Sequence, residues 1–308
     1  MKSMLKLSVA VAALVQAGTA MAADPLVDVD WVKANLEAEG IAFIDLRPRG
    51  AYVEGHVPGA VHSQYGGPDD AWRVKVGEVR GLVRDPAEIA GHLGNIGISN
   101  DDHVVLIAAG DASADMAAAA RVYWTLHYLG HDEVSILDGG MSAYLREQDS
   151  DRKPVNPLVE GMTDLAPATF VADPRPEMIV TAEQVEAMAA EGVPLVDHRP
   201  HDSYVGVTKS GSAKVAGTIP GALNLPHPWT TVNAGGTFRD PDQLTSLYQA
   251  AGVPVVGPQV NFCNTGQMAS IGWFVSHELL GNEDAVVYDG SMADWTHSGR
   301  EVEQKVRF

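Results

Sequence analysis

Short runs of hydrophobic residues alternate along the chain with segments in which hydrophobic positions recur every three or four residues. The runs have the length of buried strands and occupy residues 41–45, 103–107, 193–196 and 259–262. Helices are expected from Val29 to about Glu39 and, after the capping box that Thr181 forms with Gln184, as far as Ala190. This alternation predicts an α/β fold in which helices flank mostly parallel sheets.

The same series of strands, helices and motifs occurs twice. Asp45 and Arg47 follow the first of these strands as Asp197 and Arg199 follow the third. Further matching positions lie 151 residues apart: Leu129-Gly130 with Leu280-Gly281, Asp138-Gly139 with Asp289-Gly290, and Tyr144 with Trp295. Several matches in one order indicate an internal duplication.

The duplication predicts two domains joined by a linker. We expect the first domain at residues 23–148 and the second at 178–308, with about ten extra residues, 206–216, in the second copy. Residues 149–177 are rich in proline and acidic residues, which is typical of a linker that wraps around folded domains. A length of 308 residues agrees with two domains.

The first 22 residues have the features of a secretory signal peptide. Lys2 and Lys6 flank the start of an apolar run, and Ala20-Met21-Ala22 is a small-residue cleavage signature before Ala23. The run is shorter than a bilayer span, which disfavours the alternative of an uncleaved membrane anchor. We expect cleavage after Ala22 and a soluble periplasmic protein.

The chain is strongly acidic, which limits its partners. Its formal charge is −19, and it becomes −21 without Lys2 and Lys6. This charge disfavours nucleic acids and anionic membranes as partners. The histidines lack the spacing of metal ligands, and there is no nucleotide-binding loop, so we expect no metal and no cofactor.

The stretch 260–280 contains the most reactive candidate group, Cys263, which is the only cysteine of the chain. It lies between a predicted strand and a predicted helix. Backbone N–H groups and the positive end of a helix dipole meet at such a position, and both favour a thiolate and attract anions. Cys263 is therefore a candidate nucleophile, and the alternative is a buried, inert thiol.

A six-residue loop is expected directly after the cysteine. It consists of Asn264, Thr265, Gly266, Gln267, Met268 and Ala269. Its N–H groups are candidates to stabilise a negative sulfur, and Gly266 permits a tight curl of the backbone. The matching position in the first copy is Ala112, or Asp111 with a one-residue gap, so only the second copy has a strong nucleophile.

These residues resemble the rhodanese family, specifically its tandem-domain sulfurtransferases. The resemblance covers nearly the whole chain after residue 22, through Asp45-Leu46-Arg47 and 55–60 in the first copy and through Asp197-His198-Arg199, 217–222, 263–269 and Asp289-Gly290 in the second. It implies two rhodanese-like α/β domains, of which the first is inactive. It also implies transfer of a sulfane sulfur from a small anionic donor such as thiosulfate, through a persulfide on Cys263, to cyanide or a thiol.

The residues of the loop depart from both main groups of this family. Thiosulfate-preferring relatives have basic residues after the cysteine and mercaptopyruvate-preferring ones have Gly-Ser, whereas this chain has Asn264-Thr265. Relatives also tend to have a second arginine where this chain has Ser203, and Lys209 or Lys214 are candidates to supply the missing charge. Thiosulfate is the expected donor, and 3-mercaptopyruvate is the alternative.

Two residues beside the loop have open roles. Arg199 is a candidate to bind the sulfonate or carboxylate end of a donor, with Asp197 in support. The alternative is that Asp197 and Arg199 form a structural network only, as Asp45 and Arg47 are expected to do in the first copy. His56 is expected to be structural.

Two other functions remain to be weighed. Cysteine phosphatases have the pattern Cys-x5-Arg, but Ala269 occupies the arginine position, so bidentate phosphate binding is not expected. The second is a non-enzymatic persulfide carrier or anion-binding module that turns over only with a dedicated partner.

Overall fold

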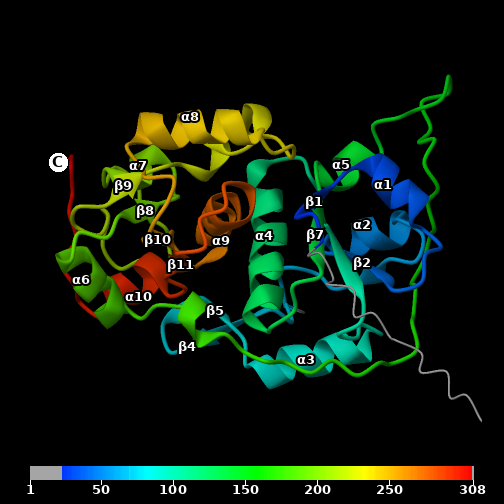
Figure 1. Ribbon diagram of the computed structural model, residues 1–308, viewed down its shortest axis with the longest axis horizontal. Coiled ribbons are helices and arrows are strands. Elements are labelled where there is room, and N and C mark those ends of the chain that lie inside the picture. The colour runs from blue at the N-terminus through cyan, green and yellow to red at the C-terminus, as the bar shows by residue number, and fades with distance from the viewer. Residues whose placement is uncertain (1–22, 69, 307–308) are drawn as a thin grey trace, which may run out of the picture.

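Two parallel sheets, one in each repeat, organise the molecule. The computed structural model describes residues 23–306 except residue 69 (Figure 1). The first sheet has the order β1-β7-β6-β2-β3, and its strands are β1 (Leu26–Val27), β2 (Ile41–Asp45), β3 (Val61–His62), β6 (His103–Ile107) and β7 (Val134–Leu137). The second has the order β11-β10-β8-β9, and its strands are β8 (Leu195–Asp197), β9 (Leu223–Asn224), β10 (Gln259–Phe262) and β11 (Ala285–Val287).

The two sheets have the same topology. Their strands pair in parallel throughout, and β7-β6-β2-β3 corresponds strand for strand to β11-β10-β8-β9. At the edge, Leu26 pairs with Ile136 in β7, and Ile179 forms the matching single bridge to Val287 in β11. The expected α/β fold with mostly parallel sheets is confirmed.

Helices cover both sheets. Those of the first repeat are α1 (Val29–Ala34), α2 (Arg49–Glu54), α3 (Pro86–Asn95), α4 (Ser113–Tyr128) and α5 (Gly140–Tyr144). Those of the second repeat are α6 (Ala182–Ala190), α7 (His201–Tyr204), α8 (Pro241–Ala251), α9 (Gln267–Phe274), which continues into a π-helical turn at Val275–Leu279, and α10 (Ser291–His297). Short 3-10 turns lie at Pro176–Met178, His227–Trp229 and Val232–Ala234.

Most elements begin and end where the sequence predicts. The strands β2, β6 and β10 and the helix α6 have the predicted bounds, and the capping box of Thr181 and Gln184 is formed. The strand predicted at 193–196 begins two residues later and ends one residue later, as β8 at Leu195–Asp197. The first helix is shorter than predicted, because it ends at Ala34 instead of near Glu39. The side-chain amide of Asn35 donates to the Trp31 carbonyl at 2.8 Å, which offers this acceptor an alternative to the next helical N–H.

The helices α4 and α9 pack against each other and join the two repeats. They lie side by side at the centre of the molecule (Figure 1). Tyr123 of α4 meets the ring of Phe274 of α9 edge to face, with centroids 4.8 Å apart. A single hydrophobic cluster contains buried residues of both repeats, so the interface resembles a domain core.

A hairpin of the first repeat reaches the second repeat. Strands β4 (Arg73–Val76) and β5 (Val79–Val83) pair antiparallel, and β5 contacts α10 (Figure 1). The backbone N–H of Val83 donates to Asp289 of the second repeat at 2.8 Å. In return, the N–H of Phe238 donates to Asp138 of the first repeat at 2.9 Å. Each repeat therefore sends a short hairpin to the carboxyl edge of the other sheet.

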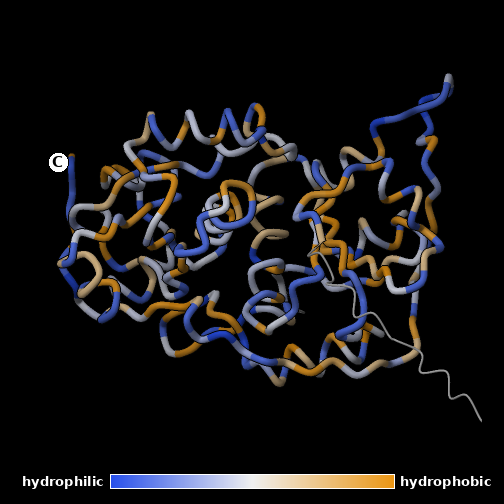
Figure 2. The backbone as a smooth tube through the Cα atoms, in the orientation of Figure 1, coloured by the Kyte–Doolittle hydropathy of each residue, from blue (hydrophilic) through white to orange (hydrophobic). Residues whose placement is uncertain are grey.

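The segment 149–177 runs along the outside of the first repeat (Figure 1). Val159 forms a bridge with His56, and the backbone of Val171 bonds the side chain of Asn100. Hydrophobic stretches follow the strands inside the molecule, whereas the part of this segment that projects outward is hydrophilic (Figure 2). Across the described residues, 23–68 and 70–306, we find no helix that is long and apolar enough to cross a membrane. The predicted signal peptide lies outside these residues.

Candidate functional site

Cys263 lies at the carboxyl edge of the second sheet, directly after its inner strand β10. The residue is fully buried, and its carbonyl accepts the N–H of Met292 at 3.1 Å. Its own N–H donates to the hydroxyl of Ser291 at 3.1 Å. The thiol therefore has a fixed backbone, held by the start of α10.

The loop after Cys263 is shorter than the sequence predicts. Helix α9 begins at Gln267, so Gln267, Met268 and Ala269 form its first turn and only residues 264–266 are loop. The N–H groups of a first helical turn have no acceptors within the helix. These three groups are candidate donors to an anion near the thiol.

Gly266 makes the turn into the helix and requires glycine. Its φ angle is +83°, which side-chain-bearing residues rarely adopt. A Cβ atom at this position would collide with the guanidinium of Arg121 and lie 2.7 Å from a carboxylate oxygen of Asp289. The N–H of Gly266 donates to Ser291 at 3.2 Å, so this group braces the loop and is not free for a ligand.

Arg121 brings a buried positive charge from the first repeat to the loop. It lies on α4, and its guanidinium contacts Asp289 at 2.6 Å and donates to the carbonyl of Gly81 at 3.2 Å. The side chain is fully buried, and its Nε and Nη1 have no partner among the described residues. The first repeat therefore supplies a cation with unused donors next to Gly266.

Tyr65, also from the first repeat, is close to the same region. Its hydroxyl is buried and has no hydrogen-bond partner among the residues that the structure describes. Burial is the largest influence on its pKa and raises it well above the usual value, against the opposing charges of Arg73 and Arg121. The phenol consequently stays protonated and available as a donor at neutral pH.

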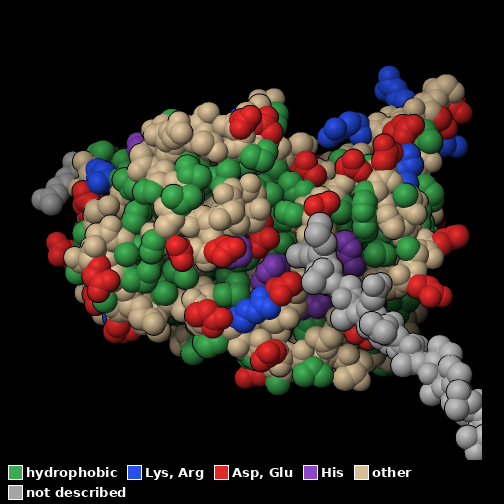
Figure 3. All heavy atoms as spheres, viewed as in Figure 1, with side chains coloured by type: hydrophobic (Ala, Val, Ile, Leu, Met, Phe, Trp, Pro, Cys, Tyr) green, Lys and Arg blue, Asp and Glu red, His purple; other side chains and the backbone are tan. Residues whose placement is uncertain are grey.

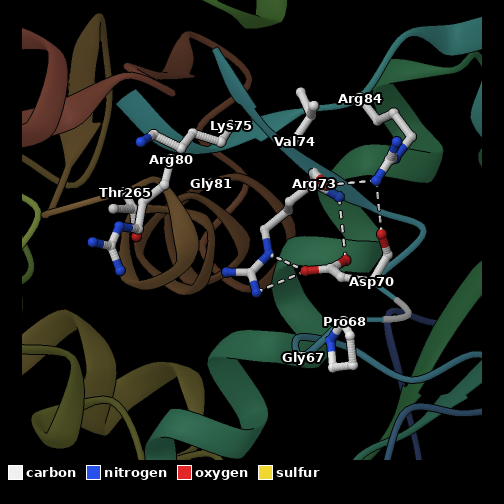
Figure 4. A pocket seen from close by; sticks show the side chains of 10 residues that line it. All are labelled: Gly67, Pro68, Asp70, Arg73, Val74, Lys75, Arg80, Gly81, Arg84 and Thr265. Atoms are coloured by element: carbon white, nitrogen blue, oxygen red, sulfur yellow. Dashed lines mark hydrogen bonds and ion pairs between the residues drawn. The ribbon is translucent and has the colours of Figure 1, made fainter. Parts of the chain in front are cut away.

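A cleft of about 430 Å³ lies between the β4–β5 hairpin and the loop (Figure 4). Thr265 lines it on the side of the loop. Four cationic side chains and one carboxylate also line it: Arg73, Lys75, Arg80, Arg84 and Asp70. This is a concentration of positive charge in a chain whose net charge is −19.

The cations of this cleft differ in how far they are already paired. Arg73 forms a two-pronged contact with Asp70, at 2.9 Å from Nε and 2.8 Å from Nη2, and its guanidinium stacks on Tyr65 at 4.0 Å. Arg84 pairs with Glu88 at 3.2 Å. Within the described residues the guanidinium of Arg80 has no ion-pair partner, and Figure 4 shows it beside Thr265.

A second cleft, of about 360 Å³, adjoins the other side of the loop. Gln267, Tyr65 and Arg73 line it together with residues at the carboxyl edge of the first sheet, among them Ala109 and Ala114. The side-chain amide of Gln267 donates to the carbonyl of Ala114 at 3.1 Å. The carboxyl edge of the first sheet therefore borders the same cleft as Gln267 of the second repeat.

Asp197 and Arg199 form a buried network behind the site. Arg199 binds Asp197 through Nε at 2.9 Å and Nη2 at 2.6 Å, and Nη2 also donates to the carbonyl of Gly217. Asp45 and Arg47 have the same geometry in the first repeat, with Nε at 3.0 Å and Nη2 at 2.6 Å. Arg199 is buried, and Asp197 and Gly217 occupy its Nε and Nη2 donors, so this geometry favours the structural alternative over the donor-binding role that the sequence suggested.

The other sequence candidates for a second cation lie elsewhere. Lys209 donates to the carbonyls of Ser210 and Ala213 in its own loop, and neither Lys209 nor Lys214 lines the two clefts. His56 is buried between Tyr52, on which it stacks, and Thr163 of segment 149–177. Its structural role is as expected.

The cations that line the cleft come from a segment for which the sequence predicted no role. Arg73, Lys75, Arg80 and Arg84 lie within twelve residues, in a chain that has only 21 Lys and Arg. This local excess of basic residues was the feature of the sequence that could have indicated an anion-binding segment. Elsewhere acidic side chains dominate, as on the face seen in Figure 3, where Asp and Glu are many and Lys and Arg are few.

Comparison with known proteins identifies the family. The family described as "Rhodanese-like domain" matches residues 28–147 and 181–298, which correspond to the two repeats. The chain belongs to the rhodanese family.

Relatives specify the class further. A protein of Mycolicibacterium smegmatis is 31% identical over 90% of this chain and 95% of its own length, and one of Haloferax volcanii is 32% identical over 89% and 94%. Both carry the name "Putative thiosulfate sulfurtransferase". SseA from Escherichia coli, described as a 3-mercaptopyruvate sulfotransferase, is 26% identical and superposes with a TM-score of 0.69 over 87% of this chain and 98% of that one. The protein is a sulfurtransferase with two rhodanese-like domains.

One further structure supports the fold alone. EanB in its wild-type form superposes with a TM-score of 0.73 at 24% identity, over 92% of this chain and 70% of that chain. The tandem arrangement of two rhodanese-like domains is thus found in proteins of distant sequence.

Proposed function

We propose that this sulfurtransferase moves a sulfane sulfur from thiosulfate to a thiophilic acceptor through a persulfide on Cys263. In the first step the Cys263 thiolate attacks the outer sulfur of thiosulfate. A new S–S bond forms, the original S–S bond breaks, and sulfite leaves with the electron pair. In the second step cyanide or an acceptor thiolate attacks the outer sulfur and releases the Cys263 thiolate.

The observation that carries this proposal is the position of Cys263. It is the only cysteine of the chain and lies in the turn between β10 and α9, four residues before the first helical turn, whose N–H groups belong to Gln267, Met268 and Ala269. Donors that are fixed in a water-poor site stabilise developing negative charge without reorganisation. They suit a persulfide, whose outer sulfur is negative.

The choice of thiosulfate rests on the relatives and on charge. The relatives at 31% and 32% identity have thiosulfate sulfurtransferase in their names. The cationic cleft beside Thr265 suits a small dianion. The likeness to SseA at 26% identity favours a second candidate, 3-mercaptopyruvate, as the donor.

The experiment is a donor panel with purified protein. We expect sulfite release with thiosulfate and thiocyanate formation when cyanide is added, with a larger kcat/KM than for 3-mercaptopyruvate. A larger kcat/KM for 3-mercaptopyruvate would show that this compound is the preferred donor, and the persulfide on Cys263 would remain part of the proposal. Loading of Cys263 without release to cyanide or small thiols would instead support the persulfide carrier.

We also propose that the chain is exported to the periplasm and cleaved after Ala22. The support is the charged start, the apolar run and the Ala20-Met21-Ala22 signature. Amino-terminal sequencing of the protein from a periplasmic extract should begin at Ala23. A cytoplasmic protein that retains Met1 would contradict export.

A further inference from the structure

We propose that the β4–β5 hairpin of the first repeat binds the oxyanion end of the sulfur donor, through Arg80 and Arg73, while the reacting sulfur meets Cys263 of the second repeat. The inference rests on the proposed persulfide function and assigns the anion-binding residues that the second repeat lacks. The oxyanion is the sulfonate end of thiosulfate or the carboxylate of a mercapto acid, and the experiment below includes both.

The hairpin is held against the cysteine loop at two points. A Cβ atom on Gly81 would lie 2.8 Å from the carbonyl oxygen of Thr265 and 2.9 Å from its Cβ, so only a glycine permits this close approach. The Gly81 carbonyl also accepts from buried Arg121. Two residues further along β5, the N–H of Val83 bonds Asp289. These contacts fix the backbone next to Arg80.

The position of Arg80 follows from this anchoring. It directly precedes Gly81, and its guanidinium lies beside Thr265 at the cleft wall (Figure 4). Thr265 is two residues from Cys263 along the chain, so the hairpin next to Arg80 packs against the loop that follows the nucleophile, although it belongs to the other repeat.

Arg73 forms the opposite part of the cleft. Asp70 engages its Nε and Nη2, and stacking on Tyr65 holds its plane. Nη1 has no hydrogen bond within the described residues. Arg73 lines both clefts beside the loop, so it borders every opening that we find next to Thr265 and Gln267.

The remaining charges of the cleft are already compensated. Lys75 lies 3.8 Å from Glu78, and Arg84 lies 3.2 Å from Glu88. Among the described residues, Arg80 is therefore the cation of the cleft that has no ion-pair partner. A guanidinium presents two parallel N–H donors, which match two oxygens of a sulfonate or a carboxylate.

The test compares Arg80→Gln with the matched variant Arg239→Gln. Arg239 has the same place in the second repeat that Arg84 has in the first, because Arg84-Asp85-Pro86 and Arg239-Asp240-Pro241 both open a helix. Arg239 donates to the carbonyl of Trp229 and lines neither cleft beside the loop. Its loss removes one charge from a comparable position away from Cys263.

With thiosulfate and with 3-mercaptopyruvate, we expect Arg80→Gln to lower kcat/KM roughly 10- to 100-fold, mainly through KM, as for a lost hydrogen bond to a charged group. If kcat/KM falls with one of the two donors and not with the other, Arg80 binds the oxyanion of the affected donor. Arg239→Gln should change kcat/KM less than about twofold, because Arg239 lies outside both clefts and acts on the donor only through screened, long-range interactions. Arg80→Lys should retain part of the affinity.

A second readout separates this proposal from the persulfide chemistry. Alkylation of Cys263 is measured with anionic iodoacetate and with neutral iodoacetamide, and neither reaction transfers sulfur. We expect the ratio of iodoacetate to iodoacetamide rates to fall in Arg80→Gln and to stay constant in Arg239→Gln. An unchanged ratio together with an unchanged KM would overturn the role of Arg80, even if Cys263 forms a persulfide. A changed ratio in a protein that never forms a persulfide would contradict the proposed function and leave the anion site standing.

Discussion

The guanidinium of Arg121, on the central helix of the first repeat, lies 2.6 Å from the carboxylate of Asp289, on the loop that follows the last strand of the second repeat. Both side chains are almost fully buried, and both lie where a Cβ atom on Gly266 would have to fit. Asp289 also accepts the N–H of Val83 from the hairpin. One ion pair therefore joins the interface of the repeats, the hairpin and the cysteine loop.

Removal of Arg121 should destabilise the protein strongly. Arg121→Met leaves Asp289 as a buried charge without its partner, which costs about 3–5 kcal/mol. Urea unfolding should show this loss, and the double variant Arg121→Met/Asp289→Asn should recover a large part of it because no buried charge remains. If the double variant is as unstable as the single one, the ion pair is not the cause.

Gly266→Ala should impair both stability and activity. The left-handed backbone costs about 1–2 kcal/mol for a residue with a side chain, and the new Cβ would collide with Arg121. We expect kcat/KM to fall roughly 100-fold, as for a misplacement of about 1 Å at the reacting centre.

Gly281→Ala is the control for this substitution. Gly281 also has a positive φ, +73°, but a Cβ atom there meets nothing within 4 Å. It should therefore lose stability by about 1 kcal/mol and keep its activity. Equal effects of the two substitutions on activity would show that the contacts of Gly266 do not matter.

Buried histidines predict a loss of stability in mild acid. Burial, together with a smaller effect of the nearby charge of His198, lowers the pKa of His227 to about 4. The unfolded chain takes up this proton near pH 6.5, whereas the folded chain does so only near pH 4. The contribution of neutral His227 to the free energy of unfolding is therefore fully present above pH 6.5. It falls by no more than about 3 kcal/mol as the pH drops from 6.5 to 4.

Unfolding midpoints between pH 7.5 and 4.5 measure this effect. His227→Gln should have a shallower pH dependence than the native protein, because it lacks this proton. The same slope in both proteins would assign the acid sensitivity to other groups, such as His198, whose pKa burial also lowers.

Ser291 should be required for the geometry of the thiol. Its hydroxyl accepts from the N–H groups of Cys263 and Gly266, and it donates to the Tyr288 carbonyl. Ser291→Ala leaves two buried N–H groups without an acceptor, at a cost of about 1–3 kcal/mol each. Sulfur transfer and the unfolding midpoint should fall together, while Ser298→Ala, at an exposed hydroxyl, should change neither.

Local features of the sequence were enough to predict the fold and the nucleophile. The strand β10, Cys263 and helix α9 follow each other along the chain, so hydrophobic periodicity locates them. The repeat of β7-β6-β2-β3 as β11-β10-β8-β9 was visible as a repeated order of motifs. The start of α9 was misplaced by three residues, because a helical first turn and a polar loop have similar composition here.

The rest of the site depends on contacts across the repeats. Arg121, Tyr65 and Arg80 lie more than 140 residues before Cys263. The packing of α4 on α9 brings Arg121 to the loop, and the docking of the β4–β5 hairpin on the second repeat brings Arg80 there. Arg199, in contrast, was close in the sequence to motifs of the site, yet its guanidinium is occupied by Asp197 and Gly217. A sequence motif can mark a residue such as Arg199 as a candidate, but it does not show which acceptors its N–H groups bind.

The most direct test of the account is the intact mass of the protein after incubation with thiosulfate and removal of the excess donor. We predict a gain of one sulfur atom, located on Cys263 by peptide mapping, and its complete loss when cyanide is added. Cys263→Ser should fold as the native protein does and gain nothing. A native protein that turns over thiosulfate without any gain in mass, or a Cys263→Ser variant that still transfers sulfur, would contradict the persulfide mechanism.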